Sequence, residues 1–141
     1  MPNSDGWNRK KPTSIQRFDP PPPQPSGVDA TALEAVQQGL YEATHAQFGT
    51  SSSVFGTFPV PVAGKTGTAE KVVQPSGVDH KVLLDQSWWC GYAPADAPKI
   101  TVCALIENGG HGGTAAAPAV LKVMEQYFHK TAPPIGDIHS D

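Results

Sequence analysis

Apolar residues recur every three or four positions along residues 31–48, the spacing typical of an amphipathic helix. The apolar positions on the predicted face are Leu33, Val36, Leu40 and Ala43. Thr31 and Glu34 have the spacing of a capping box, and Gly49 is a typical signal for the end of a helix. Gly39 inside this helix costs about 1 kcal/mol relative to alanine. That cost predicts close packing of Gly39 against a neighbour.

The same spacing returns near the end of the chain and predicts a second helix from about Thr114–Ala117 to His129. Pro118 fits its first turn, where backbone N–H groups have no helical partner. The predicted buried stripe consists of Val120, Val123, Met124, Tyr127 and Phe128.

Between the helices, three stretches have the composition of strands: residues 60–73, 87–93 and 99–107. Pro61 cannot donate a ladder hydrogen bond, so the first stretch is expected to be an edge strand. The other two are nearly continuous apolar runs joined by PADAP at 94–98, which favours a hairpin in a sheet covered on both faces. Residues 49–58 and 74–86 are expected to be a loop and a polar connection.

This order of elements predicts an α+β fold in which helices flank a three-stranded antiparallel sheet. We expect three parts: a proline-rich extended segment at 1–28, the folded unit at 29–130, and a flexible tail at 131–141. With a turn centred on Asp96, a one-residue bulge would make Cys90 and Cys103 direct neighbours across the hairpin. We expect them to remain free thiols, since directly opposed strand pairs seldom meet disulfide geometry.

Composition excludes several classes of function. The net charge is −3, and no basic run is longer than Arg9–Lys11, so nucleic acid is not an expected partner. No apolar stretch approaches the roughly 20 residues that span a bilayer, and the N-terminus does not resemble a secretory signal. Two cysteines and widely spaced histidines give no metal-ligand pattern, and no cofactor is expected.

Residues 62–71, VAGKTGTAEK, carry the strongest chemical signal. A nucleotide-binding P-loop is rejected, because that motif needs a glycine where Pro59 stands and a helix after it. Lys-Thr-Gly on a strand is instead a signature of penicillin-interacting serine enzymes. An edge strand can pair with an extended acyl-peptide. A lysine and hydroxyls can hold a carboxylate, and backbone N–H groups can stabilise an oxyanion.

Four motifs occur in order along the chain. The first is the strand VAGKTGTAEK; the second and third are strands within SWWCGYAPADAPKITVCALIENGG, one ending in Gly-Tyr-Ala-Pro and the other in Glu-Asn-Gly-Gly; the fourth is the helix AAAPAVLKVMEQYF. Over residues 28–129 the chain resembles the end of the transpeptidase domain of class B penicillin-binding proteins, most of all those of penicillin-binding protein 2 type. The resemblance implies a partial serine β-lactamase/transpeptidase-like fold. It also implies a D,D-transpeptidase that cross-links peptidoglycan stem peptides and is acylated by β-lactams.

By that resemblance, Lys65 helps to bind the substrate carboxylate, and Thr66 and Thr68 offer hydroxyls to it. Gly67 leaves room for the acyl chain, and the N–H of Thr68 is one oxyanion-hole donor. Strand alternation puts Lys65 and Thr66 on opposite faces, so they are expected to meet the ligand at the strand edge. The glycine-rich loop NGGHGG is a candidate to lie near the site, but its His111 is interpreted as a solvated residue. Glu70 is interpreted as a surface charge, and the aromatic residues of 87–93 as core.

The chain departs from the family because no serine is followed by lysine three residues later, and Ser-x-Asn is also absent. The chain is therefore expected to supply one wall of the site without the nucleophile and to need the rest of the domain or self-association. The parent is expected at the extracytoplasmic face of the bacterial membrane, held by an N-terminal anchor. Two alternatives stay open: a non-catalytic module binding cell-wall peptides or a partner, and a fragment of a serine β-lactamase or carboxypeptidase.

Overall fold

The computed structural model describes residues 21–22, 24–74, 77 and 79–133. Its elements in order are α1 (Ala30–His45), α2 (Ser52–Phe55), β1 (Ala63–Val73), β2 (Val82–Ala93), β3 (Ile100–Ile106) and α3 (Ala116–Phe128). The strands form one antiparallel sheet in the order β1-β2-β3, which confirms the predicted α+β class. The segment predicted at 1–28 and the tail at 131–141 lie largely outside the described residues.

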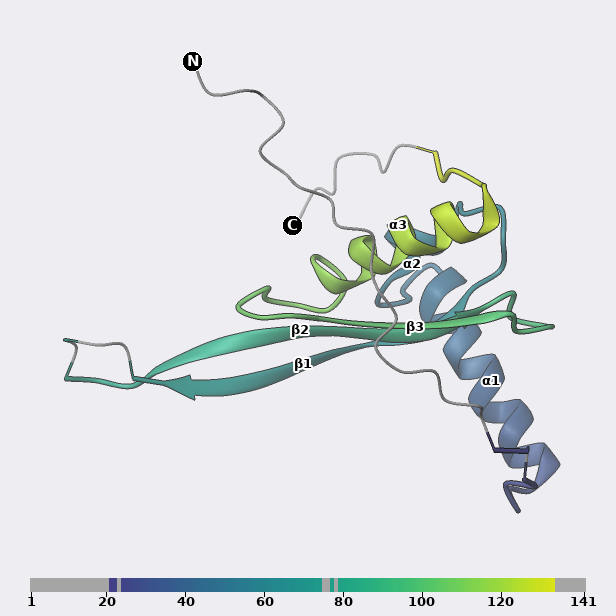
Figure 1. Ribbon diagram of the computed structural model, residues 1–141, viewed down its shortest axis with the longest axis horizontal. Coiled ribbons are helices and arrows are strands. Elements are labelled where there is room, and N and C mark those ends of the chain that lie inside the picture. The colour runs from purple at the N-terminus through teal and green to yellow at the C-terminus, as the bar shows by residue number, and fades with distance from the viewer. Residues whose placement is uncertain (1–20, 23, 75–76, 78, 134–141) are drawn as a thin grey trace.

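The sheet divides the molecule into two unequal sides (Figure 1). α2 and α3 lie together on one side, and most of α1 projects from the other. β1 and β2 continue well past the end of β3 as a long two-stranded ribbon. Residues 82–86 belong to that ribbon, so the polar connection predicted at 74–86 is wrong over its second half. Val82 pairs directly with Val73, and this pairing extends both strands.

α1 begins earlier than predicted because the Asp29 side chain accepts a hydrogen bond from the Ala32 N–H at 3.1 Å. Thr31 therefore lies inside the helix, and the predicted capping box is wrong. The helix ends at His45 instead of near Gly49, and Thr44 anchors it by donating its hydroxyl hydrogen bond to the Val62 carbonyl. Apart from the neighbouring backbone of α1 itself, no atom of the described residues lies within 4 Å of where a Cβ on Gly39 would stand, so the predicted close packing is not found.

The core lies between the sheet and the helices on the side of α2 and α3. Trp89 of β2 is fully buried and packs on Phe55 with ring centroids 4.6 Å apart. Its indole N–H donates to Ser51 Oγ at 3.1 Å. Residues 49–58 were expected to be a loop, but they contain α2 and contribute three buried apolar side chains: Val54, Phe55 and Phe58. The run SVFGTF is too short to show a helical period, so the sequence pattern did not predict α2 or its buried residues.

α3 confirms the predicted second helix but presents a different face to the core. Its buried residues are Ala116, Ala117, Val120, Leu121 and Met124. Val123 and Tyr127, predicted as buried, are about half exposed at 47% and 49%. The start of α3 is held against β2 by the hydrogen bond from the Ala116 N–H to the Ser87 hydroxyl, and both alanines are fully buried there.

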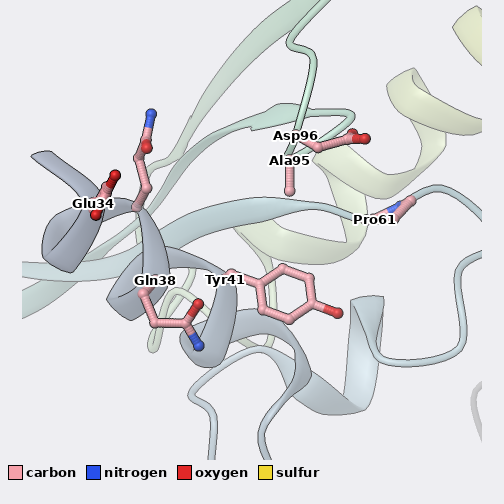
Figure 2. Close-up of a pocket in the computed structure, with 7 residues that line it drawn as sticks. Glu34, Gln38, Tyr41, Pro61, Ala95 and Asp96 are labelled. Atoms are coloured by element: carbon pink, nitrogen blue, oxygen red, sulfur yellow. The ribbon is translucent and has the colours of Figure 1, made fainter.

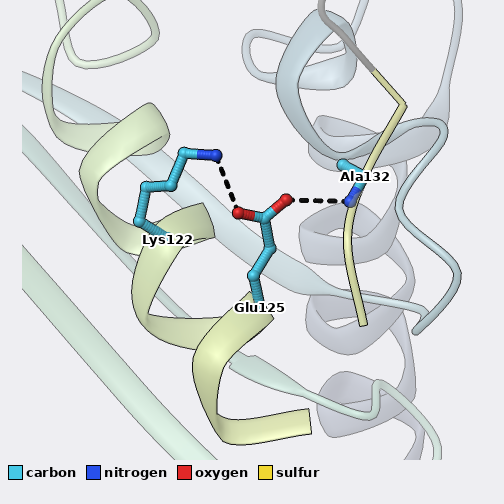
Figure 3. A network of polar contacts seen from close by, with 3 residues as sticks. All are labelled: Lys122, Glu125 and Ala132. Atoms are coloured by element: carbon cyan, nitrogen blue, oxygen red, sulfur yellow. Dashed lines mark hydrogen bonds and ion pairs between the residues drawn. The ribbon is translucent and has the colours of Figure 1, made fainter. Parts of the chain in front are cut away.

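Beyond the last turn of α3, the Glu125 carboxylate ties the chain back to the helix (Figure 3). It accepts hydrogen bonds from Lys122 Nζ and from the backbone N–H of Ala132, each at 2.8 Å. The Lys122 hydrogen bond, and after it the Ala132 hydrogen bond, hold the pKa of Glu125 below its ordinary value.

The face of the sheet opposite α3 is largely open, so the predicted cover on both faces is wrong for the described residues. Trp88 and Leu105 pair across β2 and β3 on this face and are 41% and 45% exposed. α1 cannot cover them because it lies beside β1 and makes no comparable contact with β3. Its own Leu33 and Val36 are also exposed, so part of the predicted apolar stripe of α1 lies in solvent.

Cys90 and Cys103 form a disulfide on this open face, so the prediction of free thiols is wrong. The register opposes them directly with no bulge, and their Cα atoms are 4.2 Å apart. That distance belongs to the narrow, non-hydrogen-bonded type of antiparallel pair, which brings the two Cβ atoms close together. The pair was predicted as neighbours, but the sequence did not reveal which type of pair it would be.

Candidate functional site

The four residues singled out in the sequence, 65–68, lie near the start of the edge strand β1. Pro61 precedes the strand and is not part of its ladder; its carbonyl accepts a hydrogen bond from the Ala95 N–H at 2.9 Å. Gly64 lies directly against the buried Trp89 indole, and a Cβ there would overlap the ring. The residues just before the motif are therefore fixed to the core by the contact between Gly64 and Trp89 and to the β2–β3 turn by the hydrogen bond at Pro61.

Lys65 and Thr66 meet at the edge of β1 although they point to opposite faces. Lys65 Nζ donates to Thr66 Oγ1 at 2.9 Å and to the Thr66 carbonyl at 3.1 Å. Thr66 Oγ1 in turn donates to Thr50 Oγ1 at 2.9 Å. An ammonium group and two hydroxyls thus form one chain of hydrogen bonds on the exposed edge, an arrangement suited to a carboxylate.

Gly67 is the point where the loop before α3 touches the motif. It pairs with Trp88, and a Cβ on Gly112 would lie 2.8 Å from the Gly67 carbonyl oxygen and 3.0 Å from its nitrogen. A side chain at 112 would also collide with the Trp88 carbonyl. The sequence assigned Gly67 a role in clearing space for substrate. In the structure, the missing side chain of Gly112 lets the loop backbone reach Gly67, whereas a Cβ on Gly67 itself would lie 3.2 Å from the Trp88 Cβ.

A hollow of about 430 Å³ opens beside these residues. Its lining is hydroxyl-rich and contains no acidic side chain: Thr50, Ser53, Thr66, Thr68, His111, Gly112, Gly113 and Thr114. Of the four predicted residues, Thr66 and Thr68 line it. Lys65 and Gly67 do not, but each contacts a residue that does: Lys65 donates to Thr66, and Gly67 lies against Gly112. Sequence reasoning missed Thr50, Ser53 and Thr114, and the only signal for the first two was the hydroxyl-rich run after α1.

A buried serine holds the loop that closes this hollow. Ser87 is fully buried; its hydroxyl donates to the His111 carbonyl at 3.0 Å and accepts from the Ala116 N–H at 3.1 Å. Thr114 donates to the same His111 carbonyl through its hydroxyl at 2.8 Å and through its N–H at 3.0 Å. The loop is therefore fixed to both β2 and the start of α3.

A second hollow, of about 520 Å³, separates α1 from the turn between β2 and β3 (Figure 2). The labelled side chains on its walls are Glu34, Gln38 and Tyr41 from α1, and Pro61, Ala95 and Asp96 opposite them. The acidic Glu34 and Asp96 make it unsuitable for an anion, since two carboxylates repel a third negative charge. The hollow beside β1 is therefore the better anion site of the two.

Other chemistry finds no support in the described part of the chain. No three His, Cys, Asp or Glu side chains gather there as metal ligands. None of the helices within residues 24–74 and 79–133 is long and apolar enough to cross a membrane. Trp89 is core as predicted, whereas Trp88 faces the open side of the sheet. Glu70 is exposed, as expected of a surface charge.

Comparison with known proteins gives a consistent result. The family model described as the penicillin binding protein transpeptidase domain matches residues 5–125, most of the chain. The peptidoglycan D,D-transpeptidase MrdA of Haemophilus influenzae is 36% identical over 110 residues, covering 74% of this chain and 17% of that protein. The peptidoglycan D,D-transpeptidase PbpA of Mycobacterium tuberculosis is 41% identical over 76 residues, covering 50% of this chain and 14% of that protein.

Among solved structures, the crystal structure of Pseudomonas aeruginosa PBP2 in complex with WCK 5153 is similar with a TM-score of 0.60 and 31% sequence identity. The match covers 77% of this chain and 22% of that one. The chain thus spans less than a quarter of the length of each of these relatives.

Proposed function

The chain belongs to the penicillin binding protein transpeptidase domain family, and we propose that it forms the carboxylate-binding wall of a peptidoglycan D,D-transpeptidase. The observation that carries this proposal is the hydrogen-bonded chain from Lys65 through Thr66 to Thr50 on the exposed edge of β1. Its ligand would be the C-terminal carboxylate of a peptidoglycan stem peptide, or the carboxylate of a β-lactam.

Each of the four residues has a role that follows from its position. Lys65 supplies positive charge, and Thr66 and Thr68 direct hydroxyls toward the carboxylate. The open edge of β1 offers backbone groups to an extended peptide, as edge strands do in other peptide-binding domains. Gly67 keeps that edge clear of a side chain, and the N–H of Thr68 would donate to the oxyanion formed during acyl transfer.

The acyl-transfer step itself needs a nucleophile from outside this chain. An acyl-enzyme forms only on an activated hydroxyl or thiol, and no serine here has lysine three residues on. We therefore propose that the folded unit at 29–130 acts with the remaining part of a transpeptidase domain. The open sheet face and the free edge of β3 are where that part would pack.

We also propose that the parent protein works on the extracytoplasmic side of the bacterial membrane. The Cys90–Cys103 disulfide supports this location, because such bonds persist in oxidising compartments and are rare in the cytosol. Stem peptides are cross-linked in the cell wall, so the compartment and the substrate agree.

A titration of the chain followed by amide NMR tests the proposal. N-acetyl-D-alanyl-D-alanine should shift the amide signals of residues 65–68, and the same dipeptide with its carboxylate amidated should bind much more weakly. Lys65→Met and Thr66→Val should weaken binding of the carboxylate form, while Lys71→Met, farther along β1, should leave it unchanged. Equal binding of the free acid and the amide would contradict the assignment of a carboxylate site.

A further inference from the structure

We propose that His111 is a further binding residue of this site, contacting the carboxylate-bearing end of the acyl donor beside Thr66 and Thr68. This inference rests on the proposed function and extends it to a loop that the sequence had left as solvent-exposed. His111 comes from the segment between β3 and α3, more than 40 positions after Lys65. The fold nevertheless brings it to the same hollow.

The backbone of His111 is held too firmly for a simple surface loop. Three donors converge on its carbonyl: the buried Ser87 hydroxyl at 3.0 Å, the Thr114 hydroxyl at 2.8 Å and the Thr114 N–H at 3.0 Å. The next residue, Gly112, lies against the backbone of Gly67. His111 is therefore fixed one residue away from the contact between the loop and the motif.

The side chain of His111 is left free while its backbone is fixed. It is exposed, and no hydrogen bond joins its ring to another residue of the described part of the chain. An imidazole ring can donate a hydrogen bond in its neutral form and from both nitrogens in its charged form. Because the lining contains no acidic side chain, no fixed negative charge there opposes a carboxylate that enters the hollow.

The hollow therefore offers two groups of donors to a carboxylate. The first group is the Thr66 and Thr68 hydroxyls of β1, with the Lys65 ammonium next to Thr66; to donate to a ligand, the Thr66 hydroxyl would turn away from Thr50. The second is the His111 ring, carried by a loop from a different part of the sequence. Donors from two elements would fix the orientation of a planar carboxylate as well as its position, and this is what selectivity for a free C-terminus requires.

The test compares two variants of His111 in the full chain. His111→Ala removes the ring, and His111→Gln keeps one N–H donor; His80→Gln, in the distant turn between β1 and β2, is the matched control. Binding of N-acetyl-D-alanyl-D-alanine should weaken about fivefold in His111→Ala and less in His111→Gln, as loss of one exposed charge-assisted contact implies. The amidated dipeptide should bind the wild type and both variants equally.

The result that overturns the inference is a wild-type chain that binds the free acid at residues 65–68 while both His111 variants bind it with unchanged affinity. A wild-type chain that shows no preference for the free acid contradicts the proposed function instead. Amide spectra of each variant show whether it remains folded, and the Gln variant, which is close to His in size, keeps the test valid if the Ala variant unfolds.

Discussion

Replacing Gly64 with alanine probes how the binding motif is joined to the core. The added methyl group would overlap the distal ring of the buried Trp89 indole and would lie 2.8 Å from the Cys90 carbonyl oxygen. The indole has no room to retreat, since it packs on Phe55 and donates to Ser51. Either β1 or the tryptophan has to shift, and β1 carries Lys65 as its next residue.

The expected cost follows from measured small-to-large substitutions in cores, which typically destabilise by about 1–3 kcal/mol. Loss of glycine flexibility in the unfolded chain offsets about 0.4–1 kcal/mol of this. We therefore expect Gly64→Ala to lower the free energy of unfolding by about 1–2 kcal/mol. With a urea dependence of about 1.5 kcal/mol per M, the midpoint should fall by about 1 M.

A double-mutant cycle measured by urea denaturation identifies the cause. Trp89→Phe removes the distal ring atoms that collide with the new methyl group. The contact with the Cys90 carbonyl oxygen remains in that background, so Gly64→Ala should still destabilise, but by about 1 kcal/mol less than beside Trp89, and this difference is the coupling between the two changes. Gly39→Ala is the control of opposite sign: its Cβ meets no atom within 4 Å, so it should stabilise the helix by up to about 1 kcal/mol.

Equal costs of Gly64→Ala with Trp89 and with Phe at position 89 would refute the reasoning. That result would mean that the glycine is needed for its backbone freedom, and not for the space that the indole occupies.

Three further predictions concern the rest of the molecule. The denatured chain should show no free thiol without reductant, and two reactive thiols would contradict the disulfide. The double variant Cys90→Ala/Cys103→Ala should lower the free energy of unfolding by about 3 kcal/mol, the value expected for a closed loop of about 15 residues. Because its folded pKa is lowered, Glu125 stabilises the fold above its unfolded pKa, and this contribution is lost as the pH falls through its folded pKa. Glu125→Gln should therefore lower the free energy of unfolding by about 0.5 kcal/mol at pH 7 and leave it unchanged in acid. A loss of stability that does not depend on pH would point to packing instead. The free β3 edge and open face should make the isolated chain self-associate in light scattering, and Leu105→Lys should reduce that association; a stable wild-type monomer would mean that the chain closes its own core.

The sequence predicted the sheet well because its signals are local. Strand composition, a turn at 94–98 and the motif at 65–68 each depend on neighbours along the chain. The open face could not be predicted in the same way, because an apolar run such as ITVCALI looks identical whether its cover belongs to this chain or to another. The prediction of which helix faces are buried was wrong for a related reason. Leu33 and Val36 follow the helical period, yet no part of the described chain covers them.

The candidate site divides in the same way. Lys65, Thr66, Gly67 and Thr68 were recognisable because they are consecutive in one motif. Thr50 and His111 reach the same hollow through tertiary contacts, and their sequence signals, a hydroxyl-rich run and a histidine in a glycine-rich loop, are too weak to place them there. The disulfide could not be predicted because it requires Cys90 and Cys103 to be opposed in one exact register of the hairpin. A shift of one residue would move one of the two side chains to the other face of the sheet.

Acylation of a chimaeric enzyme is the most direct test of the central claim, that this chain supplies the carboxylate-binding wall of a transpeptidase. In it, residues 29–130 replace the matching segment of Pseudomonas aeruginosa PBP2, and labelling by a fluorescent penicillin is followed by denaturing electrophoresis. The account predicts that the folded chimaera is labelled, that Lys65→Ala lowers its labelling rate at least tenfold while Lys71→Ala does not, and that the chain alone is never labelled. A folded chimaera labelled equally fast with and without Lys65, or a stable labelled band from the chain alone, would contradict it.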